Sequence, residues 1–575
     1  MPASARCLPL VVLTALLFPG CSSHKSKEQF SQIAEEFVYK SLSYSPVAAT
    51  QVGYHRHGDV DLDSKIDDYS PVTLDKQRQW LLDVRRRLQQ SLDEKSLSPD
   101  EAADLDIIHD QISLSLLELQ SIQSYRHNPT LYVELVGNAL YSPFVLEYTD
   151  KGKRFGHIIN RLRALPNLIH DAHANLASAP DLWTKVAIEE NEGNIALIDK
   201  TLREAVPQGQ RAAYDAAAKP AIDALREFNE FLARELSKKN YDWRLGPDKY
   251  AQKFRYVIAT DQTPDQVLAS AEEEMKNVRQ SMANIAQQLG YKSIKQALDA
   301  IATKHGAPDT YFADARRDLE ETRQFVKEKN LLTLPPRDNL QVIETPEFMR
   351  GIYSVGGFNA APALEPQLGA FYWITPIPPA WPKERIESKL REYNTYGLKL
   401  LTIHEAMPGH YVQLEYSNDL QPKLRRVLRS VYGSGVYVEG WAVYATEMML
   451  DAGYLDNSQE LRLTFLKQQL RVLANTILDV RLQTKGMTDQ QALDLMINQA
   501  FQEREEAEGK LRRAKLSSTQ LPTYFVGYRD WMRLRKRYQA EKGDASKLKD
   551  FHEAALKAGA VPLPVLSRLL LGKSL

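Results

Sequence analysis

Apolar residues recur at helical spacing through most of this 575-residue chain. The first such stripe contains Phe30, Ile33, Phe37 and Val38, and follows a polar stretch, residues 22–27, which we interpret as a tether. No repeat of fixed period is visible, so a solenoid of helical repeats is disfavoured. The pattern predicts a mainly α protein.

Three helix starts carry capping residues. Ser98–Glu101 supplies an N-cap serine, a proline at the first helical position and a glutamate at the third, and predicts a helix to about Tyr125. Thr263–Gln266 repeats this chemistry, and its helix is expected to stop at Gly290. Thr488–Gln491 predicts a third start of the same kind.

The segment between Pro335 and Pro382 differs from the rest because prolines interrupt it repeatedly. Between them, residues 341–343 (Gln-Val-Ile) and 371–374 (Phe-Tyr-Trp-Ile) predict short strands. Helix is expected to resume near Lys383. We therefore predict a large helical fold with a small β-sheet, divided into an N-terminal helical lobe, residues 21–250, and a second lobe, residues 251–575.

Residues 1–20 are typical of a bacterial lipoprotein signal. Arg6 gives a weakly basic start, Leu8 to Phe18 is apolar, and Cys21 stands where the lipidated first residue of the mature chain would be. Phe18 and Pro19 depart from the usual residues before such a cysteine, which leaves a plain secretory signal as the alternative. The apolar run is too short to cross a bilayer as a helix.

This signal predicts a protein in the cell envelope, held to the membrane only through lipid on Cys21. Ser22 is typical of lipoproteins sent to the outer membrane, so we expect the body to face the periplasm. Cys7 and Cys21 are the two cysteines of the chain. The mature body then offers no thiol, and any metal ligand must be His, Asp or Glu.

The charge balance excludes some partners. The chain has 73 basic and 74 acidic residues, a net charge of −1 and an isoelectric point near 6.9. That balance provides no electrostatic footprint for nucleic acid or an anionic membrane surface. Charged residues at 26% and hydrophobic residues at 43% are typical of a folded globular protein.

Two histidines carry the clearest candidate chemistry. Residues 404–410 read His-Glu-Ala-Met-Pro-Gly-His, and a further carboxylate, Glu439, follows 439 − 410 = 29 residues later. Two imidazoles and a distant carboxylate are the parts of a hydrolytic zinc site. We predict that His404, His410 and Glu439 bind Zn²⁺, and that Glu405 is the general base that takes a proton from zinc-bound water.

The spacing of the two histidines departs from the usual i, i+4 pattern. On a straight helix an i, i+6 pair is rotated by roughly 240° and cannot share one ion. Pro408 and Gly409 predict a break in the helix, which would bring His410 round to His404. In the alternative interpretation the histidines are unrelated, and His410 merely opens a new helix.

Apolar neighbours surround Glu439 in the sequence, including Val438 and Trp441. An unpaired carboxylate buried there would cost several kcal/mol, which a metal would offset. The alternative is a solvent-facing glutamate on an amphipathic helix. Glu447, two turns further on, is either a partner that orients the ligands or a surface acid.

Peptide hydrolysis also needs a hydrogen-bond donor for the developing oxyanion. Tyr524 and Tyr528 are the catalytic candidates for this role. His552 is a weaker candidate, since a histidine on a late helix is usually structural. Arg512 and Arg513 could bind a substrate carboxylate, or could belong with the rest of residues 510–515 to a solvated basic face. Residues 371–374 could bind the substrate backbone as an added strand or form a core strand.

These residues together resemble the bacterial family catalogued as domain of unknown function 885, which is grouped with the glutamate-zincin metallopeptidases. Its hallmark His-Glu-x-x-Pro-Gly-His is matched by residues 404–410, and its Glu-Gly-Trp-Ala by residues 439–442. Its Tyr-x-x-Gly is matched by residues 524–527, and its Phe-His-Asp by residues 551–553, where glutamate replaces aspartate. The Pro-Gly-Gln-Ala of many members is replaced by residues 520–523 (Gln-Leu-Pro-Thr), which bears on the role of Tyr524.

Residues 53–57 (Gly-Tyr-His-Arg-His), followed by Asp59, Asp61 and Asp63, are similar to the family's N-terminal signature. The resemblance therefore covers nearly the whole mature chain. It implies a predominantly helical, metallopeptidase-like fold with a small sheet beside a long active-site cleft, and makes residues 251–575 the catalytic lobe.

Three functions remain open. The first is zinc-dependent hydrolysis of short peptides in the cell envelope. The second is a lipid-anchored binding or scaffold protein whose metal site is structural or degenerate, and the third is a metal amidase that acts on cell-wall peptides. The peptidase would show turnover that a chelator abolishes and that the variant Glu405→Gln lacks. A binding or scaffold protein would show no such turnover.

Overall fold

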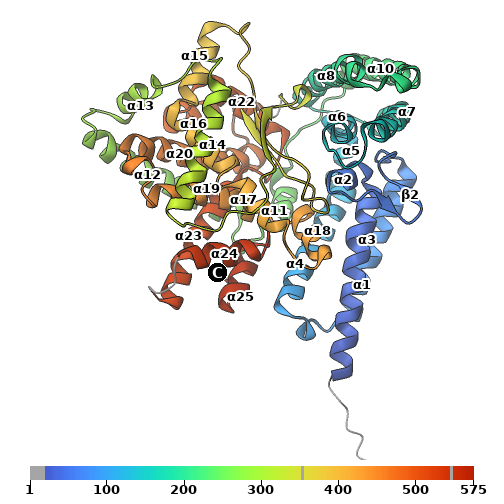
Figure 1. The fold of residues 1–575 in the computed structure, drawn as a ribbon, viewed down its shortest axis with the longest axis horizontal. Helices are drawn as coiled ribbons and strands as arrows, with labels where there is room; N and C mark the ends of the chain where they lie inside the picture. Colours follow the sequence, from blue (N-terminus) through green and yellow to red (C-terminus); the bar gives the residue numbers. More distant parts are fainter. Residues whose placement is uncertain (1–19, 351–354, 544–547) are drawn as a thin grey trace, which may run out of the picture.

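The computed structural model describes residues 20–350, 355–543 and 548–575. In these ranges the fold is mainly α, with a three-stranded sheet and a two-stranded hairpin, which confirms the predicted fold class. Figure 1 shows the three-stranded sheet between two groups of helices. The predicted signal sequence lies, apart from Gly20, outside the described residues.

The N-terminal helices differ from the sequence prediction at one point. Helix α1 begins at Gly20 and includes residues 22–27, so the expected tether is helical. No proline or glycine interrupts this stretch, and a helix once formed extends readily along such a sequence. The helices here are α1 (Gly20–Tyr44), α2 (Pro46–Gln51), α3 (Pro71–Ser91) and α4 (Pro99–Leu117).

The three predicted helix starts are confirmed. Ser98 with Glu101, Thr263 with Gln266, and Thr488 with Gln491 each exchange the two hydrogen bonds of a capping box. Helix α4 ends at Leu117, before the expected Tyr125. The chain then winds into a wider π-helical turn and reaches a left-handed residue, Gln123, with φ of 58°.

The middle of the chain is also helical. It contains α5 (Ser124–His127), α6 (Thr130–Val145), α7 (Lys151–Asn175), α8 (Asp181–Ala196), α9 (Arg203–Ala205), α10 (Arg211–Arg234), α11 (Gly246–Ile258), α12 (Pro264–Gln288), α13 (Ile294–Ala302) and α14 (Tyr311–Glu328). Helix α12 stops close to Gly290, as predicted.

The three-stranded sheet consists of β3 (Leu340–Glu344), β4 (Gly356–Asn359) and β5 (Ala370–Ile374), in the order β3-β5-β4. Strand β5 pairs parallel with β3 and antiparallel with β4. Both edges of β5 are thus occupied and all its residues are buried. Of the two alternatives for residues 371–374, β5 is therefore the core strand, because it has no free edge to which a substrate strand could be added.

The helices after the sheet complete the fold. They are α15 (Lys383–Glu392), α16 (Thr395–Glu405), α17 (His410–Ser417), α18 (Lys423–Val431), α19 (Gly435–Asp451), α20 (Gln459–Thr484), α21 (Asp489–Asp494), α22 (Arg504–Leu516), α23 (Pro522–Lys542), α24 (Leu548–Lys557) and α25 (Leu563–Leu571).

Two large apolar clusters form the core among the described residues. One combines residues from α1, α3 and α4 with residues from α11 to α25. The other lies within α6 to α10 and their connections, in the group of helices at the right of Figure 1. The predicted division into lobes at residue 250 stays a prediction.

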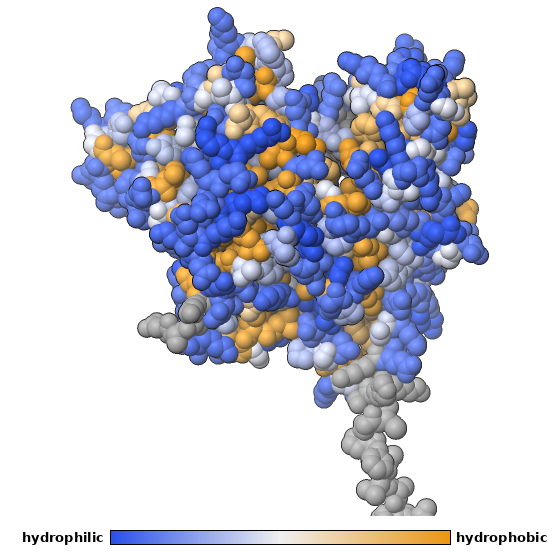
Figure 2. Space-filling view, in the orientation of Figure 1, coloured by the Kyte–Doolittle hydropathy of each residue, from blue (hydrophilic) through white to orange (hydrophobic). Residues whose placement is uncertain are grey.

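The surface shown in Figure 2 is mostly hydrophilic, with hydrophobic residues in scattered groups. Val60 and Val72 are the large hydrophobic residues exposed in the described part of the chain. None of the described helices combines the length and apolar character needed to span a membrane.

Candidate metal centre

A break in the helix brings the two histidines together. Helix α16 ends at Glu405 and α17 begins at His410, with a turn of four residues, 406–409, between them. The backbone N–H of Gly409 donates to the carbonyl oxygen of Ile403 at 2.9 Å. A Cβ atom on Gly409 would lie 1.9 Å from the carbonyl oxygen of His404, so glycine alone fits here.

Trp441 of helix α19 holds this turn from the other side. Its indole Nε1 donates a hydrogen bond of 3.0 Å to the carbonyl oxygen of Pro408, and its side chain is fully buried. Helix α19 also carries Glu439. One helix therefore both fixes the turn between the histidines and supplies the distant carboxylate.

The three predicted ligand side chains converge on one point. The Oε2 atom of Glu439 lies 3.6 Å from Nε2 of His404 and 3.4 Å from Nε2 of His410. Ligand atoms around a tetrahedral zinc ion, at bonds of 2.0–2.1 Å, stand about 3.4 Å apart. His410 does open a new helix, as the alternative interpretation held, but the two histidines lie together, and with Glu439 they form a group that could hold a metal ion.

An unsatisfied polar atom supports the same interpretation. Oε2 of Glu439 is buried and, apart from its ion-pair contacts with the two imidazoles, has no hydrogen-bond partner in the described structure. A buried carboxylate oxygen without a hydrogen bond costs free energy, which coordination of a cation would offset. The oxygen and nitrogen donors of this group also match the ligands that zinc accepts.

The charges of this group stabilise one another. Burial alone would raise the pKa of Glu439, but the facing imidazoles of His404 and His410 outweigh burial and hold it well below its usual range. Burial would lower the pKa of His410, and the facing Glu439 outweighs that effect, so the pKa of His410 is raised. Glu439 is therefore ionised at neutral pH, which is the form that binds metals.

Two cavities border the metal group: His404 lines both, whereas His410 and Glu439 line one of them. The smaller, about 190 Å³, lies between α16, α19, α20 and α22. The larger, about 500 Å³, extends toward α6 and α8. Both are lined by Gly356 of β4, His404, Glu405, Arg513 and Tyr524, so the small sheet lies beside the site as expected.

Glu405 and Tyr524 are the two candidate catalytic residues that the structure places at the metal group. The ring of Tyr524 stacks on that of His404 with centroids 6.3 Å apart, and its hydroxyl accepts a hydrogen bond from Nε2 of Gln520 at 3.2 Å. Burial raises the pKa of Tyr524, so its hydroxyl keeps its proton and can donate.

Tyr528 lies elsewhere. Its hydroxyl donates to Oε2 of Glu447 at 3.2 Å, and it lines neither cavity. Glu447 also forms an ion pair with Arg462. Tyr528 and Glu447 were both possible parts of the site in the sequence, but they are hydrogen-bonded to each other and line neither cavity.

His552 has a structural place. It is fully buried, and its Nδ1 lies 2.8 Å from the carbonyl oxygen of Leu331 while its Nε2 lies 2.7 Å from the hydroxyl of Tyr444. Nδ1 must donate to the carbonyl, so Nε2 accepts from Tyr444. Burial lowers the pKa of His552 to about 4, which keeps the ring neutral. It packs edge-on against Trp441 and supports helix α19.

The basic residues of α22, in the range 510–515, differ in their burial and in their partners. Arg512 forms an ion pair with Glu189 of α8, and Arg513 lines both cavities. Lys510 is only 6% exposed and lines the smaller cavity, so its assignment to a solvated basic face is wrong. The buried alanines at positions 507 and 514 share its helix face and could have indicated this.

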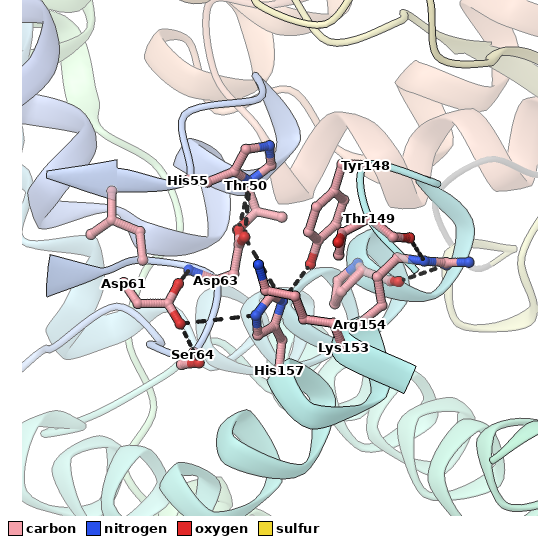
Figure 3. A network of polar contacts seen from close by, with 12 residues as sticks. Thr50, His55, Asp61, Asp63, Ser64, Tyr148, Thr149, Lys153, Arg154 and His157 are labelled. Atoms are coloured by element: carbon pink, nitrogen blue, oxygen red, sulfur yellow. Dashed lines mark hydrogen bonds and ion pairs between the residues drawn. The ribbon is translucent and has the colours of Figure 1, made fainter. Parts of the chain in front are cut away.

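The N-terminal signature forms a second polar cluster, shown in Figure 3. Asp61, Asp63 and His157 lie close enough together to hold a metal ion. Their atoms already have partners, however: Asp63 pairs with Nδ1 of His55 at 2.9 Å, and Nδ1 of His157 lies 2.9 Å from the hydroxyl of Tyr148. The cluster joins the hairpin of β1 (Arg56–His57) and β2 (Val60–Asp61) to helix α7.

The chain thus combines a mainly helical fold with a group of residues on α16, α17 and α19 that could hold a metal ion. The chain belongs to the family described as bacterial protein of unknown function (DUF885), whose model matches residues 46–570. A search of the curated proteins gives no match.

Solved structures extend this comparison. A candidate lipoprotein of unknown function from Shewanella oneidensis is 31% identical, with a TM-score of 0.78 over 94% of this chain and 99% of its own. A candidate lipoprotein from Colwellia psychrerythraea is 18% identical, with a TM-score of 0.77 over 94% and 98%, which shows the fold alone. Metallocarboxypeptidase 1 of Trypanosoma cruzi is 11% identical at a TM-score of 0.41, over 96% and 97%, and carries no argument here.

Proposed function

We propose that this protein is a zinc-dependent peptidase that hydrolyses short peptides in the cell envelope. The observation that carries the proposal is the convergence of His404, His410 and Glu439 to ligand distances beside Glu405. A structural zinc site is normally closed by four protein ligands, whereas a catalytic one has three and keeps a position open. Three ligands at the junction of two cavities fit the catalytic kind.

Each residue of the site has a role in this proposal. His404, His410 and Glu439 would hold the ion, which supplies Lewis acidity by lowering the pKa of a water and polarising the peptide carbonyl. Glu405 takes a proton from the attacking water and delivers it to the nitrogen of the leaving amine. The C–O bond to the water oxygen forms first, and the C–N bond then breaks as the amine takes the proton. Tyr524 donates a hydrogen bond to the carbonyl oxygen as it gains negative charge.

The surroundings of the site favour short peptides as substrates. The two cavities lie among α6, α8, α20 and α22, and their volumes of about 190 and 500 Å³ suit a few residues of a peptide better than a folded protein. We further propose that lipid on Cys21 anchors the protein to the outer membrane, with its body in the periplasm. The two bacterial structures that match most of the chain are themselves described as candidate lipoproteins.

The variant Glu405→Gln tests the assignment of the base. It keeps the shape of the side chain and all three ligands, so we expect it to bind zinc like the wild type and to lose peptide turnover by at least about a hundredfold. His404→Ala and Glu439→Ala should instead lose zinc. The measurements are zinc content by mass spectrometry and hydrolysis of a mixture of short peptides, with and without chelator.

The same assay separates the other functions. Full activity in Glu405→Gln would defeat the proposed mechanism, and zinc binding without any hydrolysis would indicate a binding or scaffold protein. Hydrolysis of cell-wall stem peptides, with no action on ordinary short peptides, would indicate the metal amidase instead.

A further inference from the structure

Lys510 is an unusual residue in the wall of the smaller cavity. Its side chain is 6% exposed, and it makes no hydrogen bond or ion pair with a described residue. A buried ammonium group without a partner is costly. Lys510 therefore presents an amine without a hydrogen-bond or ion-pair partner at the edge of a cavity that also contains Glu405 and His404.

More basic than acidic side chains line this cavity. Arg471, Arg512 and Arg513 line it together with Lys510, whereas Glu405 and Glu506 are its carboxylates. Arg471 pairs with Glu506, and Arg512 pairs with Glu189, which lies outside the cavity lining. Burial and the guanidinium groups of Arg471 and Arg513 lower the pKa of Lys510 well below its usual range, and Glu506 and Glu439 offset only part of this effect. An anion bound beside Lys510 would favour the protonated form of its amine.

The rest of the wall is mixed, because Thr446, Gln468, Gln469 and Asn475 line it together with apolar residues. On α16, α19 and α20 the apolar part consists of Leu400, Leu401, Val443, Phe465 and Val472. A ligand that fits this apolar part needs an apolar group next to its negative charge. An aspartate or glutamate side chain would satisfy the lysine and leave the apolar part without a contact. A C-terminal residue with an apolar side chain satisfies both.

We propose that the smaller cavity receives the C-terminal residue of a peptide, with its free carboxylate on Lys510 and Arg513 and an apolar side chain against the wall. This inference rests on the proposed peptidase function, and makes the protein a carboxypeptidase. The last peptide bond breaks, the oxygen of water joins the carbonyl carbon of the preceding residue, and the released amino acid takes a proton on its nitrogen. Lys510 is then the specificity-determining residue.

Paired substrates test this assignment. We would compare Ala-Ala-Phe with its C-terminal amide on the zinc-loaded full chain, and expect kcat/KM to be about tenfold to hundredfold higher for the free acid, which corresponds to one charged hydrogen bond. Lys510→Met keeps an apolar stem of similar length and should abolish this discrimination, mainly through KM for the acid. Lys515→Met is the matched control, because Lys515 is on the same helix, pairs with Asp489 and lines neither cavity.

The inference would be overturned if the wild type cleaved the amide as well as the acid, or if Lys510→Met kept the wild-type discrimination with an unchanged thermal midpoint. Titration calorimetry separates this failure from that of the proposed function. Suppose that no peptide is hydrolysed, but that the wild type binds phenylalanine more tightly than phenylalanine amide and Lys510→Met does not. This result would support the carboxylate site and reject the peptidase function. Equal binding of both compounds, or no binding of either, would reject the carboxylate site.

Discussion

Gly440 of α19 and Gly527 of α23 face each other in backbone contact. A Cβ atom on Gly440 would lie 2.5 Å from Cα of Gly527, and one on Gly527 would lie 2.2 Å from the carbonyl oxygen of Val436. The first glycine follows Glu439 directly, and the second comes three residues after Tyr524. The close packing of these helices therefore sets the position of the tyrosine relative to the metal group.

Replacing either glycine should destabilise the protein. Gly→Ala within a helix is normally stabilising by up to about 1 kcal/mol, but here the added methyl meets backbone, and overpacking of this kind costs about 1–3 kcal/mol. We expect a lower thermal midpoint for Gly440→Ala and Gly527→Ala. Gly156→Ala on α7 is the control, since the nearest atom to its Cβ position is 4.0 Å away. A raised midpoint in Gly440→Ala would show that the contact is absent.

The hydrogen bond from Trp441 to Pro408 should matter for metal binding. Trp441→Phe leaves a buried carbonyl unpaired, which costs about 1–3 kcal/mol, and releases the turn between the histidines. Trp531→Phe loses a comparable bond of 3.0 Å, to the carbonyl oxygen of Tyr437. We expect similar losses of stability in both, and a marked loss of zinc affinity in Trp441→Phe alone. Equal zinc affinities, measured by competition with a chelating dye, would contradict this role.

Replacing the two tyrosines of α23 should have different effects on kcat. Tyr524→Phe removes the donor that faces both cavities, so kcat should fall by about 10²–10³ with zinc content unchanged. Tyr528→Phe breaks a bond to Glu447 and should affect stability more than kcat. A larger loss of kcat in Tyr528→Phe than in Tyr524→Phe would reverse the assignment.

His552 should make stability depend on pH. Its folded pKa is about 4, and its unfolded pKa is near 6.5, so the unfolded chain binds more protons between these values. The stabilisation by neutral His552 is complete above about pH 6.5 and is lost as the pH falls toward 4. At pH 5 the loss is roughly 2 kcal/mol. His552→Gln should remove this component, so the difference in unfolding free energy from wild type should shrink between pH 7.5 and 5. A pH-independent difference would show that the ring is not held neutral.

Local chemistry made part of this fold predictable. The capping box of Ser98 and Glu101 and the break at Pro408 and Gly409 depend on contacts within a few residues, and the structure has both. The strand β4 was missed because its sequence, Gly-Gly-Phe-Asn, has no alternating pattern, and it exists through pairing with β5.

The misassigned side chains share a different cause. Lys510 has the charge of a surface residue, yet packing of α22 against other helices buries it. Tyr528 lies one turn from Tyr524 on the same helix, and only the three-dimensional position of Glu447 decides where its hydroxyl is bound. Burial and partners of this kind come from distant segments, which a single sequence does not bring together.

One zinc ion is expected to bind between His404, His410 and Glu439. Anomalous diffraction at the zinc edge, from crystals of the zinc-loaded protein, measures its position. We predict one strong peak at 2.0–2.2 Å from Nε2 of each histidine and from a carboxylate oxygen of Glu439. Zinc bound elsewhere, with no peak between these three side chains, would show that they do not form the metal site.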